Sequence, residues 1–177
     1  MSDANPIRQS FNRAATTYTA SAALQQLVRN QLLSQATSRL GREEASTILD
    51  AGCGTGYASA VMSRLVSAVI ALDSEKALLD RATETLSALG CDNVVTVEGA
   101  IEKGFASEAP YDVIFINGAV DAVPDALFAQ LRDGGRLVAV EGAGNSARAM
   151  LYIRDREYMS GRRVFNAAVK PIPGFQK

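Results

Sequence analysis

From residue 46 onward, short apolar runs alternate with stretches of helical periodicity. The runs are continuously apolar rather than alternating with polar residues, as expected for parallel strands whose two faces are both covered. These runs are Thr47–Ala51, Ala68–Leu72, Val94–Val97, Asp112–Ile116 and Arg136–Val140. Strands that alternate with helices at this spacing predict an α/β protein with a parallel sheet and right-handed crossovers.

Two of the intervening stretches carry clear helix signals. In the first, apolar residues recur at helical spacing, and a glycine follows as a C-terminal cap. This stripe consists of Leu78, Ala82, Leu86 and Leu89, and the glycine is Gly90. In the second, Pro124 fits a first helical turn. Its predicted buried face is Leu127, Phe128 and Leu131, and Gly134 is expected to end the helix.

The two ends of the chain differ from this middle part. The apolar runs Ala149–Ile153 and Arg163–Ala167 are separated by a polar turn, which predicts an antiparallel hairpin that closes the sheet. Before Ser46, the spacing of the leucines predicts mostly helix. We therefore expect a helical N-terminal cap over residues 1–45 and one α/β domain over residues 46–177.

Composition narrows the chemistry. The 177 residues include no histidine, which excludes a serine–histidine triad and a histidine general base. Two cysteines, Cys53 and Cys91, cannot by themselves build a zinc site or a disulfide framework, so we expect no metal and a cytoplasmic protein with reduced thiols. The formal net charge of −1 gives no reason to expect nucleic acid or an anionic membrane as a partner, and no stretch is apolar enough to span a bilayer.

The densest chemical signal is the segment Asp-Ala-Gly-Cys-Gly-Thr-Gly at 50–56, directly after the first predicted strand. Its glycines, Gly52, Gly54 and Gly56, permit a tight turn and a close approach of backbone N–H groups to a ligand. The next strand ends in Asp73, about 20 residues after Gly52, where a carboxylate can accept both hydroxyls of a ribose. Together these features predict a site for an adenosine-containing cofactor.

The glycine spacing selects among such cofactors. A dinucleotide pyrophosphate favours G-x-G-x-x-G, whose third glycine would fall at Tyr57. An acidic residue two before the first glycine, followed by G-x-G-x-G, resembles the class I S-adenosylmethionine-dependent methyltransferases. That resemblance implies a three-layer Rossmann-like fold, a mostly parallel seven-stranded sheet and S-adenosylmethionine as cofactor, with Asp50 attracting its ammonium group directly or through water. A nicotinamide or flavin site and a structural turn without a ligand are the alternatives.

The same resemblance assigns further residues to the cofactor. Ser74 lies beside Asp73 on the ribose side. Ala100 and Ile101 follow the third strand, where the adenine is expected, and many members of the class carry an acid at the position of Ala100. Asn117, at the tip of the fourth strand, would lie near the transferable methyl group, although asparagine is also an ordinary turn former.

A longer resemblance covers residues 52–175, which are similar to the protein-L-isoaspartate O-methyltransferase family, in particular its shorter bacterial branch. The segment Asp133–Leu137 is generic for methyltransferases, whereas Val123–Leu127 and the closing Pro171–Phe175 are far more particular. The other matching segments are Gly56–Val61, Pro110–Phe115, Gln130–Val138 and Val164–Ala168. This resemblance implies methylation of a carboxylate oxygen on an isoaspartyl residue.

The leader resembles a different family. Residues 7–35, centred on Phe11–Tyr18, are similar to the biotin-pathway malonyl-carrier-protein O-methyltransferases, in which this segment lies over the cofactor. Tyr18 would then help to close the site, whereas hydrophobic anchoring of an N-terminal helix is the plainer interpretation. The hydroxyl-bearing leader segment of the first family and the helical substrate insertion of the second both lack a counterpart here, so each family's substrate-recognition element is expected to be missing.

Both resemblances imply methyl transfer to a carboxylate, which agrees with the missing histidine. A carboxylate with a pKa near ~4 is already ionised at about pH 7, so no general base has to remove a proton. We predict an S-adenosylmethionine-dependent O-methyltransferase of the isoaspartate type, acting on a peptide or small carboxylate acceptor. The alternatives are a cofactor-binding module with little turnover and a malonyl-thioester methyltransferase. Lys170 and the pairs Arg162–Arg163 and Arg154–Arg156 are candidates for holding an anionic substrate, although such side chains are usually only solvated. The catalytic residues and the oligomeric state stay open.

Overall fold

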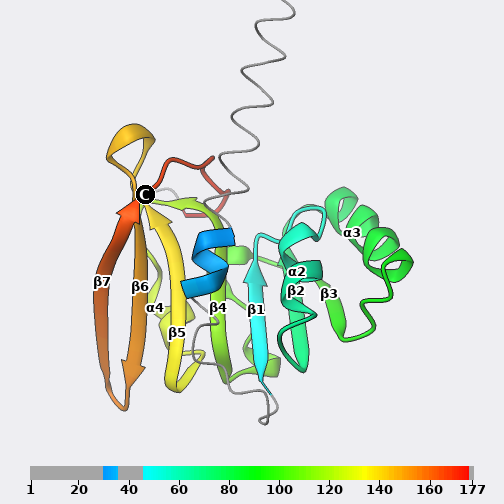
Figure 1. Ribbon diagram of the computed structural model, residues 1–177, viewed down its shortest axis with the longest axis horizontal. Coiled ribbons are helices and arrows are strands. Elements are labelled where there is room, and N and C mark those ends of the chain that lie inside the picture. The colour runs from blue at the N-terminus through cyan, green and yellow to red at the C-terminus, as the bar shows by residue number, and fades with distance from the viewer. Residues whose placement is uncertain (1–29, 36–45, 176–177) are drawn as a thin grey trace, which may run out of the picture.

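The computed structural model describes residues 30–35 and 46–175, which form one α/β sheet structure. Seven strands pair in the order β3-β2-β1-β4-β5-β6-β7 (Figure 1). The strands are β1 (Thr47–Ala51), β2 (Ala68–Asp73), β3 (Val94–Glu98), β4 (Tyr111–Val120), β5 (Leu131–Glu141), β6 (Arg148–Asp155) and β7 (Tyr158–Asn166). The pairs among β1 to β5 are parallel and the β5–β6 and β6–β7 pairs are antiparallel, so the predicted mostly parallel sheet with a closing hairpin is confirmed.

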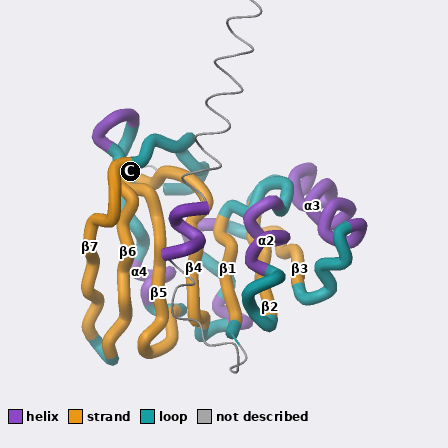
Figure 2. The backbone as a smooth tube through the Cα atoms, in the orientation of Figure 1, coloured by secondary structure: helices purple, strands orange, loops and turns teal. Residues whose placement is uncertain are grey.

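Helices cover both faces of this sheet (Figure 2). They are α2 (Tyr57–Met62), α3 (Lys76–Ala88), α4 (Asp125–Phe128) and the short 3-10 helices η1 (Ile101–Lys103), η2 (Ala106–Glu108) and η3 (Gly144–Ser146). The segment 30–35 and α2 pack on one face with Ile48 and Val113, while α4 and η1 pack on the other with Leu49 and Ile114. Because side chains alternate along each strand, neighbouring residues enter opposite core layers. The predicted three-layer arrangement is therefore confirmed.

Two details of the predicted helices are wrong. On α3 the buried side chains are Leu79, Ala82 and Leu86. Leu79, and not the predicted Leu78, packs in the core with Cys53 and Ala71. At the other end of the predicted stripe, Leu89 is 52% exposed. The helix does end at Gly90 in a Schellman arrangement, in which the Cys91 N–H donates to the Leu86 carbonyl and the Gly90 N–H to Ser87.

The second wrong detail concerns the helix that was expected to run to Gly134. The helix α4 ends at Phe128, and Leu131 already pairs with Tyr111 as the start of β5. The next pair in register is Val113 with Arg136, so the residues between them bulge out of the ladder and Gly134 turns there with φ of 76°. Tertiary strand pairing overrides the local helical spacing at this point.

The described part of the leader is helical and packs on the core. Leu32 and Leu33 are buried at 3% exposure each, and Arg136 Nη1 donates to the Gln35 carbonyl at 3.1 Å. The remainder of the predicted cap, residues 1–29 and 36–45, lies outside the described residues, and Tyr18 lies there too. Within the part of the chain that is described, no helix combines the length and apolar character needed to cross a bilayer.

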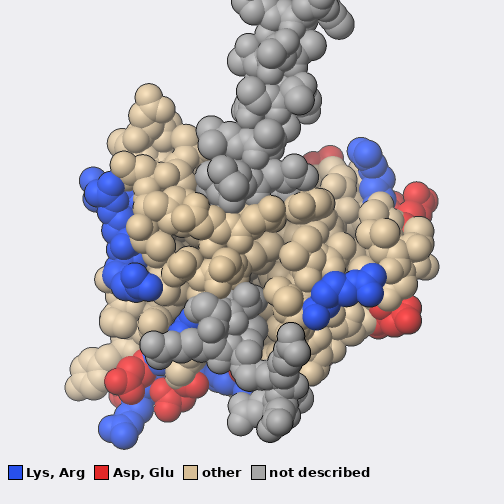
Figure 3. Space-filling view, in the orientation of Figure 1, with Lys and Arg blue, Asp and Glu red and all other residues tan. Residues whose placement is uncertain are grey.

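The far edge of the sheet is the exposed strand β7. Lys and Arg side chains gather along this edge (Figure 3), and Arg162 and Arg163 on β7 are exposed. Charged side chains on an edge strand oppose pairing with a strand from another molecule. This edge lies away from the carboxyl ends of β1 and β2, where the candidate chemistry is found.

Candidate functional site

The glycine segment forms a loop that is fastened to the neighbouring strand. The backbone N–H groups of Gly52 and Cys53 both donate to the carbonyl of Leu72 at the end of β2, at 2.8 and 3.0 Å. The Gly56 N–H closes the turn onto the Cys53 carbonyl at 3.0 Å. The loop is therefore fixed at the carboxyl end of the sheet before α2 begins.

Gly52 and Gly54 each meet a different requirement of this loop. Both have left-handed φ, 83° and 56°, which residues with a Cβ rarely adopt. A Cβ on Gly54 would meet no atom within 4 Å, whereas a Cβ on Gly52 would overlap the side chain of Ile172. Gly54 thus leaves its backbone open to a ligand, and Gly52 makes room for a buried side chain from the end of the chain.

The carboxylate of Asp73 anchors the glycine loop through hydrogen bonds to backbone N–H groups. Its Oδ2 accepts the Gly54 N–H at 2.8 Å, and its Oδ1 accepts the Glu75 N–H at 3.0 Å. An ionised carboxylate has about four acceptor positions, so two of them remain after these bonds. Asp73 is 6% exposed and combines loop positioning with spare acceptor capacity.

Asp50 lies deeper than Asp73. Its carboxylate is fully buried, and the Ser59 hydroxyl of α2 donates to Oδ2 at 2.5 Å. This bond joins the end of β1 to the first turn of α2, on either side of the glycine loop. Asp50 therefore contributes to the support of the loop.

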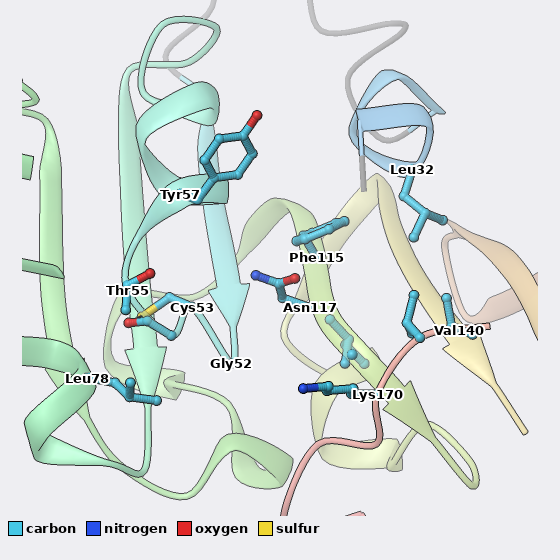
Figure 4. Close-up of a pocket in the computed structure, with 14 residues that line it drawn as sticks. Leu32, Gly52, Cys53, Thr55, Tyr57, Leu78, Phe115, Asn117, Val140 and Lys170 are labelled. Atoms are coloured by element: carbon cyan, nitrogen blue, oxygen red, sulfur yellow. The ribbon is translucent and has the colours of Figure 1, made fainter. Parts of the chain in front are cut away.

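A cavity of about 550 Å³ opens beside the loop, at the carboxyl ends of β1 and β4 (Figure 4). Its volume lies within the range of about 300–1,000 Å³ typical of small-molecule sites. Its lining residues are Leu32, Gly52, Cys53, Gly54, Thr55, Tyr57, Leu78, Phe115, Ile116, Asn117, Gly118, Val140, Val169 and Lys170. The walls combine apolar side chains such as Phe115 and Val140 with polar groups such as Thr55, Asn117 and Lys170.

A bulge in β4 forms the wall opposite the loop. Phe115 pairs with Val138 and Ala119 pairs with Val140, so β4 contains two more residues than β5 between these two pairs. Bulges of this kind redirect side chains, and here the redirected residues include Asn117 and Gly118. Both line the cavity.

The bulge is held by the C-terminal segment. The Ala119 N–H donates to the Lys170 carbonyl at 2.8 Å, and the Ile172 N–H donates to the Ala119 carbonyl at 3.0 Å. A Cβ on Gly118 would lie 2.9 Å from Ile172 Cβ and 3.2 Å from the Lys170 carbonyl oxygen. Only glycine permits this close approach, which brings Lys170 to the edge of the cavity.

Comparison with known proteins agrees with this architecture. Residues 7–172 match the family described as Protein-L-isoaspartate(D-aspartate) O-methyltransferase (PCMT). The chain belongs to this family. Its match begins at residue 7 and runs through most of the leader, whose separate resemblance to the biotin-pathway enzymes stays a prediction.

Curated isoaspartate methyltransferases align over part of their length. The protein-L-isoaspartate O-methyltransferase of Pseudomonas fluorescens is 41% identical over 110 residues, 62% of this chain and 52% of the relative. That of Halorhodospira halophila is 38% identical over 125 residues, 71% of this chain and 57% of the relative. The chain thus spans little more than half the length of these two relatives.

Solved structures share the fold. A protein-L-isoaspartate O-methyltransferase superposes with a TM-score of 0.74 at 28% identity, covering 84% of this chain and 47% of that one. A β-aspartate methyltransferase structure from Plasmodium falciparum, solved with S-adenosyl-L-homocysteine, superposes with a TM-score of 0.71 over 83% of this chain and 73% of that one. Its identity of 18% supports the fold alone.

In this member of the isoaspartate methyltransferase family, the predicted site residues fall into two groups. Gly52, Gly54 and Asn117 line the cavity together. The others that the structure describes are not among the residues that line the cavity; they are Asp50, Gly56, Asp73, Ser74, Ala100 and Ile101. Of these, Gly56 packs against α3, and Ile101 is buried beside Gly52. Their roles toward a ligand stay predictions, as does the role of Tyr18.

Several lining residues carry no recognisable signal of a binding site in the sequence. Phe115, Ile116 and Val140 were predicted only as strand residues, although ligands of such sheets bind at the carboxyl ends of strands. Leu78 was assigned to the core, and Val169 gave no signal at all. Cys53 behaves as expected for a packed thiol: burial first, then the negative charges of Asp50 and Asp73, raise its pKa, so it stays protonated at neutral pH.

Proposed function

We propose that this chain binds S-adenosylmethionine in the cavity and transfers the methyl group to the carboxylate of an isoaspartyl residue in a peptide or protein. The observation that carries the proposal is the open glycine wall at Gly54, held by Asp73, in a chain of this family. Its relatives bear the name protein-L-isoaspartate O-methyltransferase, and the Plasmodium falciparum relative was solved with S-adenosyl-L-homocysteine.

The residues present fit this cofactor. The open Cβ position of Gly54 lets a ligand contact the loop backbone directly. The remaining acceptor positions of Asp73 suit the two hydroxyls of a ribose, with Ser74 beside them. Ala100 and Ile101 are assigned to the adenine side, and Asn117, turned toward the cavity by the bulge, to the methyl side. Asp50 acts on the methionine ammonium from behind the loop, through water, and Tyr18 is assigned to the cover.

The main catalytic task of the protein in this reaction is to align the methyl donor with the carboxylate acceptor. When bound, S-adenosylmethionine supplies an electrophilic methyl group that a carboxylate oxygen can accept without the loss of a proton. The chain therefore needs no general base, in keeping with its lack of histidine. Its own residues orient the two reactants and exclude water with the apolar side chains of Leu32, Phe115 and Val140. Such alignment is worth about 7–11 kcal/mol when the geometry is good.

The same proposal includes the surroundings of the site. It keeps the predicted helical cap over residues 1–45, of which the structure describes residues 30–35. It also takes the acceptor to be a peptide rather than nucleic acid or a membrane. A cytoplasmic location belongs to it as well, because Cys53 and Cys91 are free thiols, as reducing compartments keep them.

Two measurements test the proposal. Calorimetry with S-adenosyl-L-homocysteine should show binding at micromolar concentration; no binding by the folded protein would remove the proposed cofactor. Transfer of labelled methyl groups should then occur to an isoaspartyl peptide and not to the same peptide with ordinary aspartate. Cofactor binding without any transfer would favour the binding-module alternative, and transfer to a malonyl carrier but not to the isoaspartyl peptide would favour the malonyl-thioester alternative.

A further inference from the structure

Lys170 is the charged residue among those that line the cavity in the described part of the chain. Figure 4 shows its side chain extending from the C-terminal segment toward the space below Asn117. The remaining lining side chains are apolar or neutral. Lys170 is exposed at the edge of the cavity, so its charge faces a ligand that enters from solvent. A positive charge in a cleft attracts an anion more strongly than the same charge on a flat surface, because the walls of the cleft focus its field.

The backbone of Lys170 is held in place by its neighbours. Its carbonyl accepts the Ala119 N–H, and the next backbone bond runs from Ile172 to Ala119. Ile172, 7% exposed, packs between Gly52 and Gly118 and so connects this segment to the glycine loop. A lysine with a fixed backbone at a cavity wall loses less conformational freedom on binding than one on a mobile tail.

The ammonium group of Lys170 has no ion pair or hydrogen bond with any residue that the structure describes. Neither of the two carboxylates near the loop forms an ion pair with Lys170. Asp50 accepts the Ser59 hydroxyl in the core, and Asp73 accepts backbone N–H groups behind Gly54. The charge of Lys170 is thus available to a ligand.

The position of Lys170 favours the acceptor over the cofactor. Thr55 and Leu78 lie on the glycine-loop side of the cavity, where Asp73 supports Gly54 and the ribose is predicted. Lys170 lies on the opposite side, with Asn117 and Val140 (Figure 4). Resting on the proposed function, we propose that Lys170 binds the carboxylate of the isoaspartyl acceptor and thereby selects for it. A carboxylate that gives up part of its hydration in the cleft needs a compensating charge, and an ammonium bound to one oxygen leaves the second free to accept the methyl group.

Three variants test this assignment. Lys170→Met removes the charge and keeps most of the length, Lys170→Arg keeps the charge, and Lys76→Met is the matched control because the Lys76 ammonium is paired with Asp80 on the surface of α3. We expect Lys170→Met to raise the KM for an isoaspartyl peptide about tenfold. Lys170→Arg should restore KM to within about threefold and Lys76→Met should leave it unchanged. The preference of the wild type should weaken as salt is raised.

A binding experiment keeps the test independent of turnover. With S-adenosyl-L-homocysteine present, the wild type should bind the isoaspartyl peptide more tightly than the matching isoasparaginyl peptide, and Lys170→Met should abolish that difference. A wild type without this preference, or a variant that retains it, would overturn the assignment.

A third experiment distinguishes the carboxylate of the acceptor from the carboxylate of the cofactor. If Lys170→Met weakens binding of S-adenosyl-L-homocysteine but not of its decarboxylated analogue, then Lys170 binds the cofactor's carboxylate and the assignment to the acceptor is wrong. Failure of the wild type to bind S-adenosyl-L-homocysteine at all contradicts the proposed function. Normal cofactor binding with an unchanged peptide preference in Lys170→Met contradicts only the role of Lys170.

Discussion

The two walls of the cavity are built in different ways. The glycine wall, residues 52–55, is continuous in sequence and is fastened by the Leu72 carbonyl and the Asp73 carboxylate of one neighbouring strand. The opposite wall joins the β4 bulge at Asn117 to Lys170, through the bridge between Ala119 and Pro171. The first wall depends on a local motif, and the second depends on segments that are distant in the chain. Ile172 contacts both, so the walls can be perturbed separately or together.

The largest effect is expected where the walls touch. Gly52→Val places a branched side chain at φ of 83° and against Ile172, so it should lower the free energy of unfolding by about 3 kcal/mol or more. Gly54→Ala, at φ of 56° in open space, should cost only about 1–2 kcal/mol. Denaturant unfolding measures both.

A double variant sharpens this result. If the contact with Ile172 causes the larger loss, Ile172→Ala should be less harmful in a Gly52→Ala background than in the wild type. Strictly additive changes in unfolding free energy would show that the two walls are energetically independent.

The next effect comes from the side chain that joins the walls. Ile172→Ala should lower the free energy of unfolding by about 2–3 kcal/mol, because it leaves a space between Gly52, Gly118 and Ile101. It should also weaken binding of S-adenosyl-L-homocysteine, measured by calorimetry. The control is Val95→Ala, whose side chain is 56% exposed and which should change stability by less than about 0.5 kcal/mol. An Ile172→Ala protein as stable as this control would contradict the packing role.

A smaller effect is confined to the glycine wall. Asp73→Asn keeps one carbonyl acceptor for the loop but removes the charge and an acceptor that we propose for the ribose, so affinity for S-adenosyl-L-homocysteine should fall about tenfold. Asp92→Asn, an exposed change outside the site, is the control. Unchanged affinity in Asp73→Asn would assign this carboxylate to loop support alone.

The smallest expected effect is on the pH dependence of stability, and it comes from Cys53 in the glycine wall. Because burial raises the pKa of Cys53, the unfolded thiol ionises first as pH rises past about 8.5, and the folded state loses relative stability above that pH. Cys53→Ala should therefore flatten the decline in unfolding free energy between about pH 8 and 10, by no more than about 1.4 kcal/mol per pH unit. Parallel declines in the wild type and Cys53→Ala would contradict the raised pKa.

The difference between the walls also explains what the sequence could predict. Continuous apolar runs and the G-x-G-x-G spacing depend on residues close together in the chain, so the strand positions and the glycine loop were anticipated from them. The bulge at Asn117 arises only when β4 pairs with β5, and the end of α4 at Phe128 follows from the pairing of Leu131 with Tyr111. Neither pairing can be recognised from the residues that are close to it in the sequence. For the same reason the sequence does not predict that Val169 lines the cavity, and only its charge makes Lys170 a candidate.

The contact between Ile172 and Gly52 has a consequence for the order of biosynthesis. Chains are made from the N-terminus, and early segments begin to fold first. The glycine loop and the strand that fastens it are therefore available long before residues 170–172 leave the ribosome. Until those residues pair with Ala119, the cavity lacks one of its walls, so a nascent chain should be unable to retain the methyl donor.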